Sequence, residues 1–161
     1  MIVFSKKAYD YLKYELSSYP ESETGGIFLG YVSDDKWSVI ETIFPGPNAQ
    51  HKSAMFDCDN EYVNYEVNKI ANMYNKTLCV LGLWHSHIRS SPLSLQDIKT
   101  NNLFASLNSF GAISLLIDIE KQSYTFYIIG HDGEYSQEND IMVLNSDFLN
   151  TKKMIPFSLF G

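Results

Sequence analysis

The sequence is short of the residues that mark several classes of protein. It contains only two cysteines, Cys58 and Cys79, which are too few for the disulfide framework of a small secreted domain. It has no cluster of lysine and arginine, and its net charge of −7 argues against a nucleic-acid partner, because phosphate binding needs a basic surface. No apolar stretch approaches the roughly 20 residues of a membrane-spanning helix. We therefore expect a protein that binds neither nucleic acid nor membranes.

The first residues, from Met1 to Lys7, lack the charged segment followed by an apolar segment that is typical of a signal peptide. Together with two unpaired thiols, this pattern predicts a cytoplasmic protein. The length and the 45% share of apolar residues fit one hydrophobic core, so a single domain is expected over residues 1–161. Eleven tyrosines and ten phenylalanines predict a core built partly from aromatic rings.

Local patterns predict helices and strands that interleave without a regular β-α-β repeat. Caps, breakers and apolar periodicity predict helices at residues 5–20, 59–75 and 94–108. Apolar and alternating runs predict strands at residues 24–32, 37–44, 78–84, 112–119 and 123–129. The tail after Gly133 shows no clear pattern. These elements predict the α+β class, with a mixed, mostly antiparallel sheet flanked by helices.

The predicted strand at residues 78–84 leads directly into His85, Ser86 and His87. Residues two apart on a strand point to the same face, so the two imidazoles can reach one point in space. Ser86 should point the other way and receives no chemical role. Neutral imidazole is a common ligand of zinc. Taken alone, the pattern also fits two ordinary polar residues at a strand end.

A third candidate ligand, Asp97, lies ten residues after His87 in the first turn of the third predicted helix. Ser94 and Asp97 also have the spacing of a capping box, which accounts for both residues without a metal. The intervening loop is long enough to bring Asp97 over the strand end, where it would complete a three-ligand site with one open position. Glu23 is the candidate general base, with a solvated acid as the alternative. His51 is interpreted as a surface histidine, with a substrate contact as the alternative.

Taken jointly, these motifs resemble those of the JAMM metalloproteases, also called MPN-plus or JAB proteins. The resemblance rests on Glu23-Thr24-Gly25-Gly26-Ile27-Phe28-Leu29-Gly30, on Trp84-His85-Ser86-His87, on Ser94-Leu95-Gln96-Asp97, and on Gly46-Pro47-Asn48-Ala49 with Phe56 and Asp57. Two features depart from the usual family pattern. Ile88 stands where a proline is usual, and His87 and Asp97 are one residue closer together.

The resemblance implies a cytidine-deaminase-like fold and a zinc ion bound by His85, His87 and Asp97. It also implies that Glu23 activates the metal-bound water and that Ser94 stabilises the oxyanion of the tetrahedral intermediate. The implied reaction is hydrolysis of the peptide or isopeptide bond after the C-terminal glycine of ubiquitin or a ubiquitin-like protein. The implied partners are that protein's tail and its conjugating or activating enzymes.

Three interpretations remain open at this point. The first is deconjugation or precursor processing of a ubiquitin-like protein in a bacterium, because the short connection from Asp97 to Ala112 leaves no room for long insertions. Stand-alone bacterial members of this type often lie beside conjugation genes, including antiphage operons. The second interpretation is a peptidase that releases an amino acid such as cysteine from a sulfur-carrier protein. The third is a metal-free scaffold, an interpretation that the shortened loop at residues 88–93 keeps open.

Overall fold

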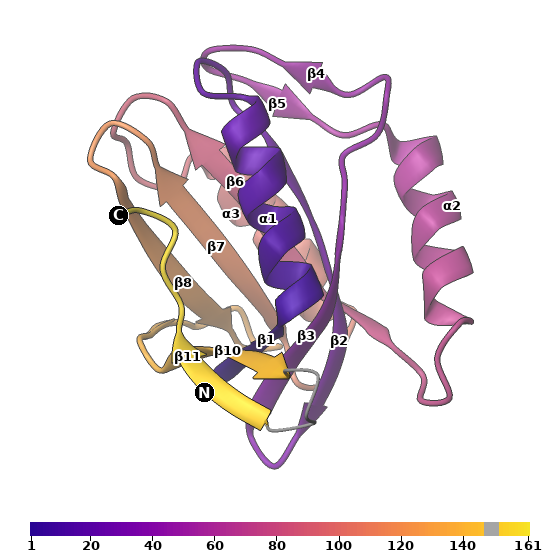
Figure 1. The fold of residues 1–161 in the computed structure, drawn as a ribbon. Coiled ribbons are helices and arrows are strands. Elements are labelled where there is room, and N and C mark those ends of the chain that lie inside the picture. Colours follow the sequence, from indigo (N-terminus) through magenta and orange to yellow (C-terminus); the bar gives the residue numbers. More distant parts are fainter. Residues whose placement is uncertain (147–151) are drawn as a thin grey trace.

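The computed structural model describes residues 1–146 and 152–161, and most of its strands form one sheet with helices on both faces (Figure 1). The strands of this nine-stranded sheet are β1 (Ile2–Ser5), β2 (Gly25–Ser33), β3 (Lys36–Ile43), β6 (Cys79–His87), β7 (Ala112–Asp118), β8 (Ser123–Ile129), β9 (Tyr135–Glu138), β10 (Ile141–Ser146) and β11 (Lys152–Pro156). A separate short hairpin consists of β4 (Gln50–His51) and β5 (Phe56–Asp57).

The nine strands lie in the order β11-β10-β1-β3-β2-β6-β7-β8-β9. Neighbours are parallel where β1 meets β10 and β3 and where β6 meets β7, and they are antiparallel elsewhere. The described helices are α1 (Lys6–Ser18), α2 (Asn60–Ala71) and α3 (Leu95–Ser106). This is the predicted α+β class with a mixed, mostly antiparallel sheet. The likeness to cytidine deaminases stays a prediction.

Helix α1 covers one face of the sheet, whereas α2 and α3 cover the other (Figure 1). In β2, Phe28 belongs to the core under α1, and its neighbour Ile27 belongs to the core under α2. The same alternation operates in β6, where Trp84 belongs to the core under α1. The side chains of His85 and His87 therefore point to the opposite face of the sheet from those of Trp84 and Ser86. His85 faces α2 and α3.

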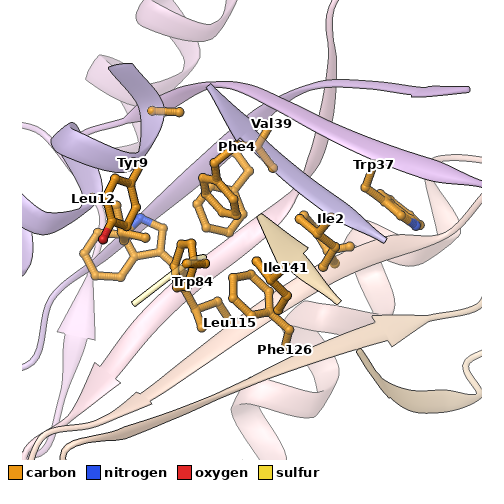
Figure 2. Close-up of a cluster of buried hydrophobic side chains, with 14 of the residues drawn as sticks. Ile2, Phe4, Tyr9, Leu12, Trp37, Val39, Trp84, Leu115, Phe126 and Ile141 are labelled. Carbon is orange, nitrogen blue, oxygen red and sulfur yellow. The ribbon is translucent and has the colours of Figure 1, made fainter. Parts of the chain in front are cut away.

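Aromatic rings form much of the core under α1, as the composition predicts (Figure 2). The ring of Phe4 lies 5.4 Å from Phe28, 5.9 Å from Phe126 and 5.0 Å from Phe157, measured between centroids. Trp84 is 1% exposed and belongs to the same cluster. Burial of one large apolar side chain contributes about 1.5–3 kcal/mol. The cluster therefore holds β6 firmly, just before the strand presents its two histidines.

The helices begin where the sequence predicts. Side-chain oxygens of Ser5, Asp59 and Ser94 accept hydrogen bonds from first-turn amides of α1, α2 and α3. Helix α2 ends earlier than predicted, because Nδ2 of Asn72 donates to the carbonyl oxygen of Asn68 and closes the last turn at Ala71. Among the described residues, none of the helices combines the length and apolar character that a bilayer crossing requires.

The sequence after Gly133 is only weakly patterned, and no helix or strand is predicted there. The described part of this segment forms β9, β10 and β11, and β10 lies parallel to β1, which was not predicted either. Strand β1 is too short to show an alternating pattern, and its pairing with β10 joins segments far apart in sequence. Strand β6 also continues through His87, where it is paired with β7, whereas its pairing with β2 ends at His85.

Candidate active site

The structure brings His85, His87 and Asp97 together where β6 ends and α3 begins. The Nε2 atoms of the two histidines are 3.1 Å apart. Oδ1 of Asp97 lies 3.4 Å from Nε2 of His85, and Oδ2 lies 3.5 Å from Nε2 of His87. Within residues 1–146 and 152–161, no other group of three His, Cys, Asp or Glu side chains is gathered in this way. Both histidines are buried, and Asp97 is half-buried.

These distances fit a tetrahedrally coordinated zinc ion. Zinc bonds to nitrogen and oxygen of about 2.0–2.2 Å, at tetrahedral angles, place neighbouring ligand atoms roughly 3.3–3.5 Å apart. The observed separations of 3.1, 3.4 and 3.5 Å are close to that range. Two imidazoles and one carboxylate are also a donor set typical of catalytic zinc sites, which keep the fourth position open.

A capping box directs the Asp97 carboxylate toward the histidines. Oγ of Ser94 accepts a hydrogen bond from the Asp97 amide at 3.0 Å, and Oδ2 of Asp97 accepts one from the Ser94 amide at 2.7 Å. Burial raises the pKa of Asp97, but hydrogen bonds from His85 and His87 outweigh it and hold this pKa well below its usual range. The carboxylate is therefore ionised, and helix capping and cation binding are compatible roles for it.

Two serines hold the loop after His87, which explains how a shortened loop still brings α3 to the cluster. Oγ of Ser90 donates to Oδ2 of Asp118 at 2.6 Å, and its amide donates to Oε2 of Glu120 at 2.8 Å. Nδ1 of His87 lies 3.2 Å from the carbonyl oxygen of Ser91 and 2.9 Å from its hydroxyl. Donation from Nδ1 to that carbonyl leaves Nε2 of His87 free to bind a cation. The sequence shows Ser90 and Ser91 only as polar loop residues.

Glu23 lines the same cavity as the three clustered residues. Burial raises the pKa of the Glu23 carboxyl group, the nearby His87 and His85 lower it, and the Asp97 carboxylate raises it, with a net increase. A carboxylate beside the three clustered residues is in a position to accept and return a proton. Ser94 also lines the cavity, so the structure places all five predicted site residues around one space.

The cavity has a volume of about 1090 Å³ and extends from the cluster toward α2. The part of its lining toward α2 includes Val63, Val67, Leu83 and Phe104, together with the polar Asn60 and Asn64. Residues 53–57 of the β4–β5 hairpin also line it. Small-molecule sites usually occupy about 300–1,000 Å³, so this cavity has room for a segment of extended peptide.

A buried chain of hydrogen bonds lies behind Glu23, on the α1 face of the sheet. Glu15, which is 7% exposed, accepts a bond from Oγ1 of Thr24 at 2.9 Å. The Thr24 amide donates to Oγ of Ser86 at 3.0 Å, and the Ser86 amide donates to the carbonyl oxygen of Thr24 at 2.8 Å. Ser86 thus points away from the histidine cluster, as predicted. Glu15 was missed, although an acid within the apolar stripe of a helix is a recognisable signal.

Glu15→Gln is expected to make the stability of the protein less dependent on pH. Burial raises the pKa of Glu15 above 4.5, although the bond from Thr24 and the nearby His51 counteract the shift. Such a group stabilises the folded state below its ordinary pKa and loses that contribution as pH rises through the folded-state pKa. Glutamine does not ionise and keeps the bond from Thr24.

The free energy of unfolding of Glu15→Gln should therefore exceed that of the native protein by a margin that grows between about pH 4.5 and pH 7. Urea denaturation at both pH values measures this margin. A margin that is constant or shrinks toward neutral pH would show that burial of an ionised Glu15 carries no cost.

Comparison with known proteins agrees with this geometry. Residues 6–109 match the family described as "JAB1/Mov34/MPN/PAD-1 ubiquitin protease". The matched segment includes Glu23, His85, His87, Ser94 and Asp97. The extension of this domain over residues 1–161 stays a prediction.

Among solved structures, the chain is similar to the solution structure of protein DSY2949 from Desulfitobacterium hafniense, with 19% identity and a TM-score of 0.60. That alignment covers 89% of this chain and 92% of the other, and it supports the fold alone. A comparison with curated proteins gave no match. The family match over residues 6–109 shows that the chain belongs to the JAB1/Mov34/MPN/PAD-1 family, which includes metal-dependent hydrolases.

Proposed function

We propose that the protein is a zinc-dependent isopeptidase that hydrolyses the bond after the C-terminal glycine of a ubiquitin-like protein. The observation that carries this proposal is the separation of 3.1–3.5 Å between the donor atoms of His85, His87 and Asp97. When bound there, zinc supplies Lewis acidity at the scissile carbonyl group and lowers the pKa of water to about 7. The same observation argues against a metal-free scaffold, which would have no need for three converging donors.

Glu23 would act as the general base and then as the general acid. Its carboxylate takes a proton from the attacking water and returns it to the leaving amine. Ser94 would stabilise the developing oxyanion. Oγ of Ser94 accepts a bond from the Asp97 amide, so its own proton remains available for donation into the cavity that it lines.

We propose that the cavity receives the extended C-terminal tail of the ubiquitin-like protein. Apolar residues of its lining, such as Val63, Val67 and Phe104, suit apolar side chains that precede the terminal glycine. The net charge of −7 of the whole chain favours a tail with basic residues. The direct passage from α3 to β7 at Ala112 leaves no room for a long insertion and supports a bacterial enzyme. By analogy with the family, we propose that it acts in the cytoplasm on products of a conjugation system, such as that of an antiphage operon.

The proposal is tested with bacterial ubiquitin-like proteins that are extended after their terminal glycine in three ways. The extension is a folded domain, an isopeptide-linked lysine peptide, or a single cysteine. Zinc-dependent cleavage of the first two, located at the glycine by mass spectrometry and abolished by a chelator, is expected. Cleavage of the cysteine extension alone would instead support a sulfur-carrier peptidase. Binding of the tail without cleavage of any substrate would overturn the enzymatic proposal.

Ser94→Ala is expected to reduce both stability and activity. Loss of the cap of α3 should lower the free energy of unfolding by about 1 kcal/mol. Loss of the hydroxyl donor at the oxyanion should lower kcat by roughly 10²-fold. Ser5→Ala is the matched control, because Ser5 caps α1 through the Ala8 amide at 3.0 Å, outside the cavity. Thermal melts and kcat measure the two effects, and equal kcat values for both variants would restrict Ser94 to helix capping.

A further inference from the structure

The peptide group that joins Glu23 to Thr24 is held by hydrogen bonds on both sides. Its carbonyl oxygen accepts a bond from Nδ1 of His51 at 3.1 Å, and its N–H donates to Oγ of Ser86 at 3.0 Å. The preceding N–H, that of Glu23 itself, donates to the carbonyl oxygen of Lys52 at 2.7 Å. All the backbone polar groups next to the Glu23 side chain are thus fixed, two of them by residues of the β4–β5 hairpin.

Aromatic neighbours hold the ring of His51. Tyr19, at the end of α1, stacks on it with a centroid distance of 3.6 Å and an angle of 8°, and Phe56 lies 5.5 Å away at 43°. The ring of Phe56 also packs directly against Gly25, where no side chain would fit, since a Cβ atom on Gly25 would lie 2.6 Å from that ring. His51 is not among the described residues that line the cavity. His51 is only partly buried, and its position outside the cavity gives no support to the alternative of a substrate contact.

The geometry points to His51 as a positioning residue for Glu23, an inference that rests on the proposed function because it takes Glu23 as the base. The bond from Nδ1 orients the peptide plane after Glu23 from the hairpin side. Ser86 fixes the same plane from β6, between the two histidines of the cluster. Together the two bonds set where the Glu23 carboxylate stands relative to His85, His87 and Asp97, and His51 itself does not touch the reacting atoms.

Two substitutions separate the hydrogen bond of His51 from the packing of its ring. His51→Asn keeps an N–H donor near the position of Nδ1 but loses the stack on Tyr19. His51→Phe keeps an aromatic ring between Tyr19 and Phe56 but loses the donor. A displacement of about 1 Å can cost 10²-fold in rate, so His51→Phe should lower kcat roughly 10- to 100-fold with unchanged KM and zinc content. His51→Asn should keep kcat much nearer the native value.

Amide exchange of Thr24, whose N–H belongs to the peptide group that His51 holds, is measured by NMR in zinc-free and zinc-loaded protein and gives a readout that does not depend on activity. Exchange should be faster in His51→Phe than in His51→Asn or the native protein. Native kcat in His51→Phe would overturn the inference, and so would a change confined to KM, which would mark a substrate contact. An equal loss of kcat in both variants would also overturn it, because the loss would then not follow the presence of the hydrogen-bond donor.

The two proposals can fail separately. If the native protein cleaves none of the substrates, the proposed function fails. The difference in Thr24 amide exchange between His51→Phe and His51→Asn then still decides whether the hydrogen bond from His51 holds this peptide group in place.

Discussion

Glu23→Gln is expected to lower kcat by roughly 10²–10⁴-fold, the contribution usual for a positioned general base. The amide has nearly the shape of the carboxylate but cannot take a proton from water. The donor atoms of His85, His87 and Asp97 are untouched by the change, so zinc content should remain at the native level. Initial rates on a fused ubiquitin-like substrate, together with elemental analysis of the same preparation, measure both quantities.

Glu21→Gln is the matched control for this experiment. Glu21 is an exposed acid two positions earlier, and it does not line the cavity. Its substitution changes the net charge by the same amount and should leave kcat near the native value. Native activity in Glu23→Gln would show that the base lies elsewhere, and loss of zinc in that variant would assign Glu23 to the metal site instead.

Asp97→Asn is expected to weaken zinc binding by more than the roughly 10- to 100-fold that the loss of an outer-shell partner costs. The change removes the negative charge of one of three donors that meet within 3.5 Å of each other. An asparagine oxygen can still accept the bond from the Ser94 amide, so the cap of α3 should survive in part. The free energy of unfolding of the zinc-free protein should therefore change by no more than about 1 kcal/mol.

Competition with a chromophoric chelator measures the zinc affinity, and urea denaturation measures the stability of the zinc-free variant. Asp10→Asn serves as the control, because Asp10 is an exposed acid of α1 that pairs with Lys6 away from the cavity. Native affinity in Asp97→Asn would remove this residue from the metal site. A collapse of stability in the zinc-free variant would make the carboxylate mainly a structural cap.

The cluster could be predicted from the sequence because its geometry is local. His85 and His87 lie two apart on one strand, which fixes their common direction. Asp97 lies in the first turn of the next helix, and the Ser94 capping box fixes its direction as well. A shorter loop could have spoiled the arrangement. Ser90 is held by Asp118, at the end of β7, and by Glu120, in the turn that follows. The loop sequence alone does not reveal these two hydrogen bonds.

The hydrogen bonds that hold the backbone at Glu23 could not be predicted, because they come from three separate segments. His51 reaches it from a hairpin whose strands have only two residues each, too short for any periodic pattern. Ser86 reaches it from the far face of β6, and Glu15 supports Thr24 from α1. The same limit applies to β1 and β10, since the pairing between them depends on the whole sheet.

Zinc content of the native chain tests the central claim most directly. The protein is purified without a metal-binding tag, incubated with zinc, dialysed and analysed for metal beside His87→Ala. The account predicts about one zinc per chain in the native protein and a clear loss in the variant, as expected for a site with three protein ligands. No zinc in either protein would contradict the account, since His85, His87 and Asp97 would then converge without holding a metal.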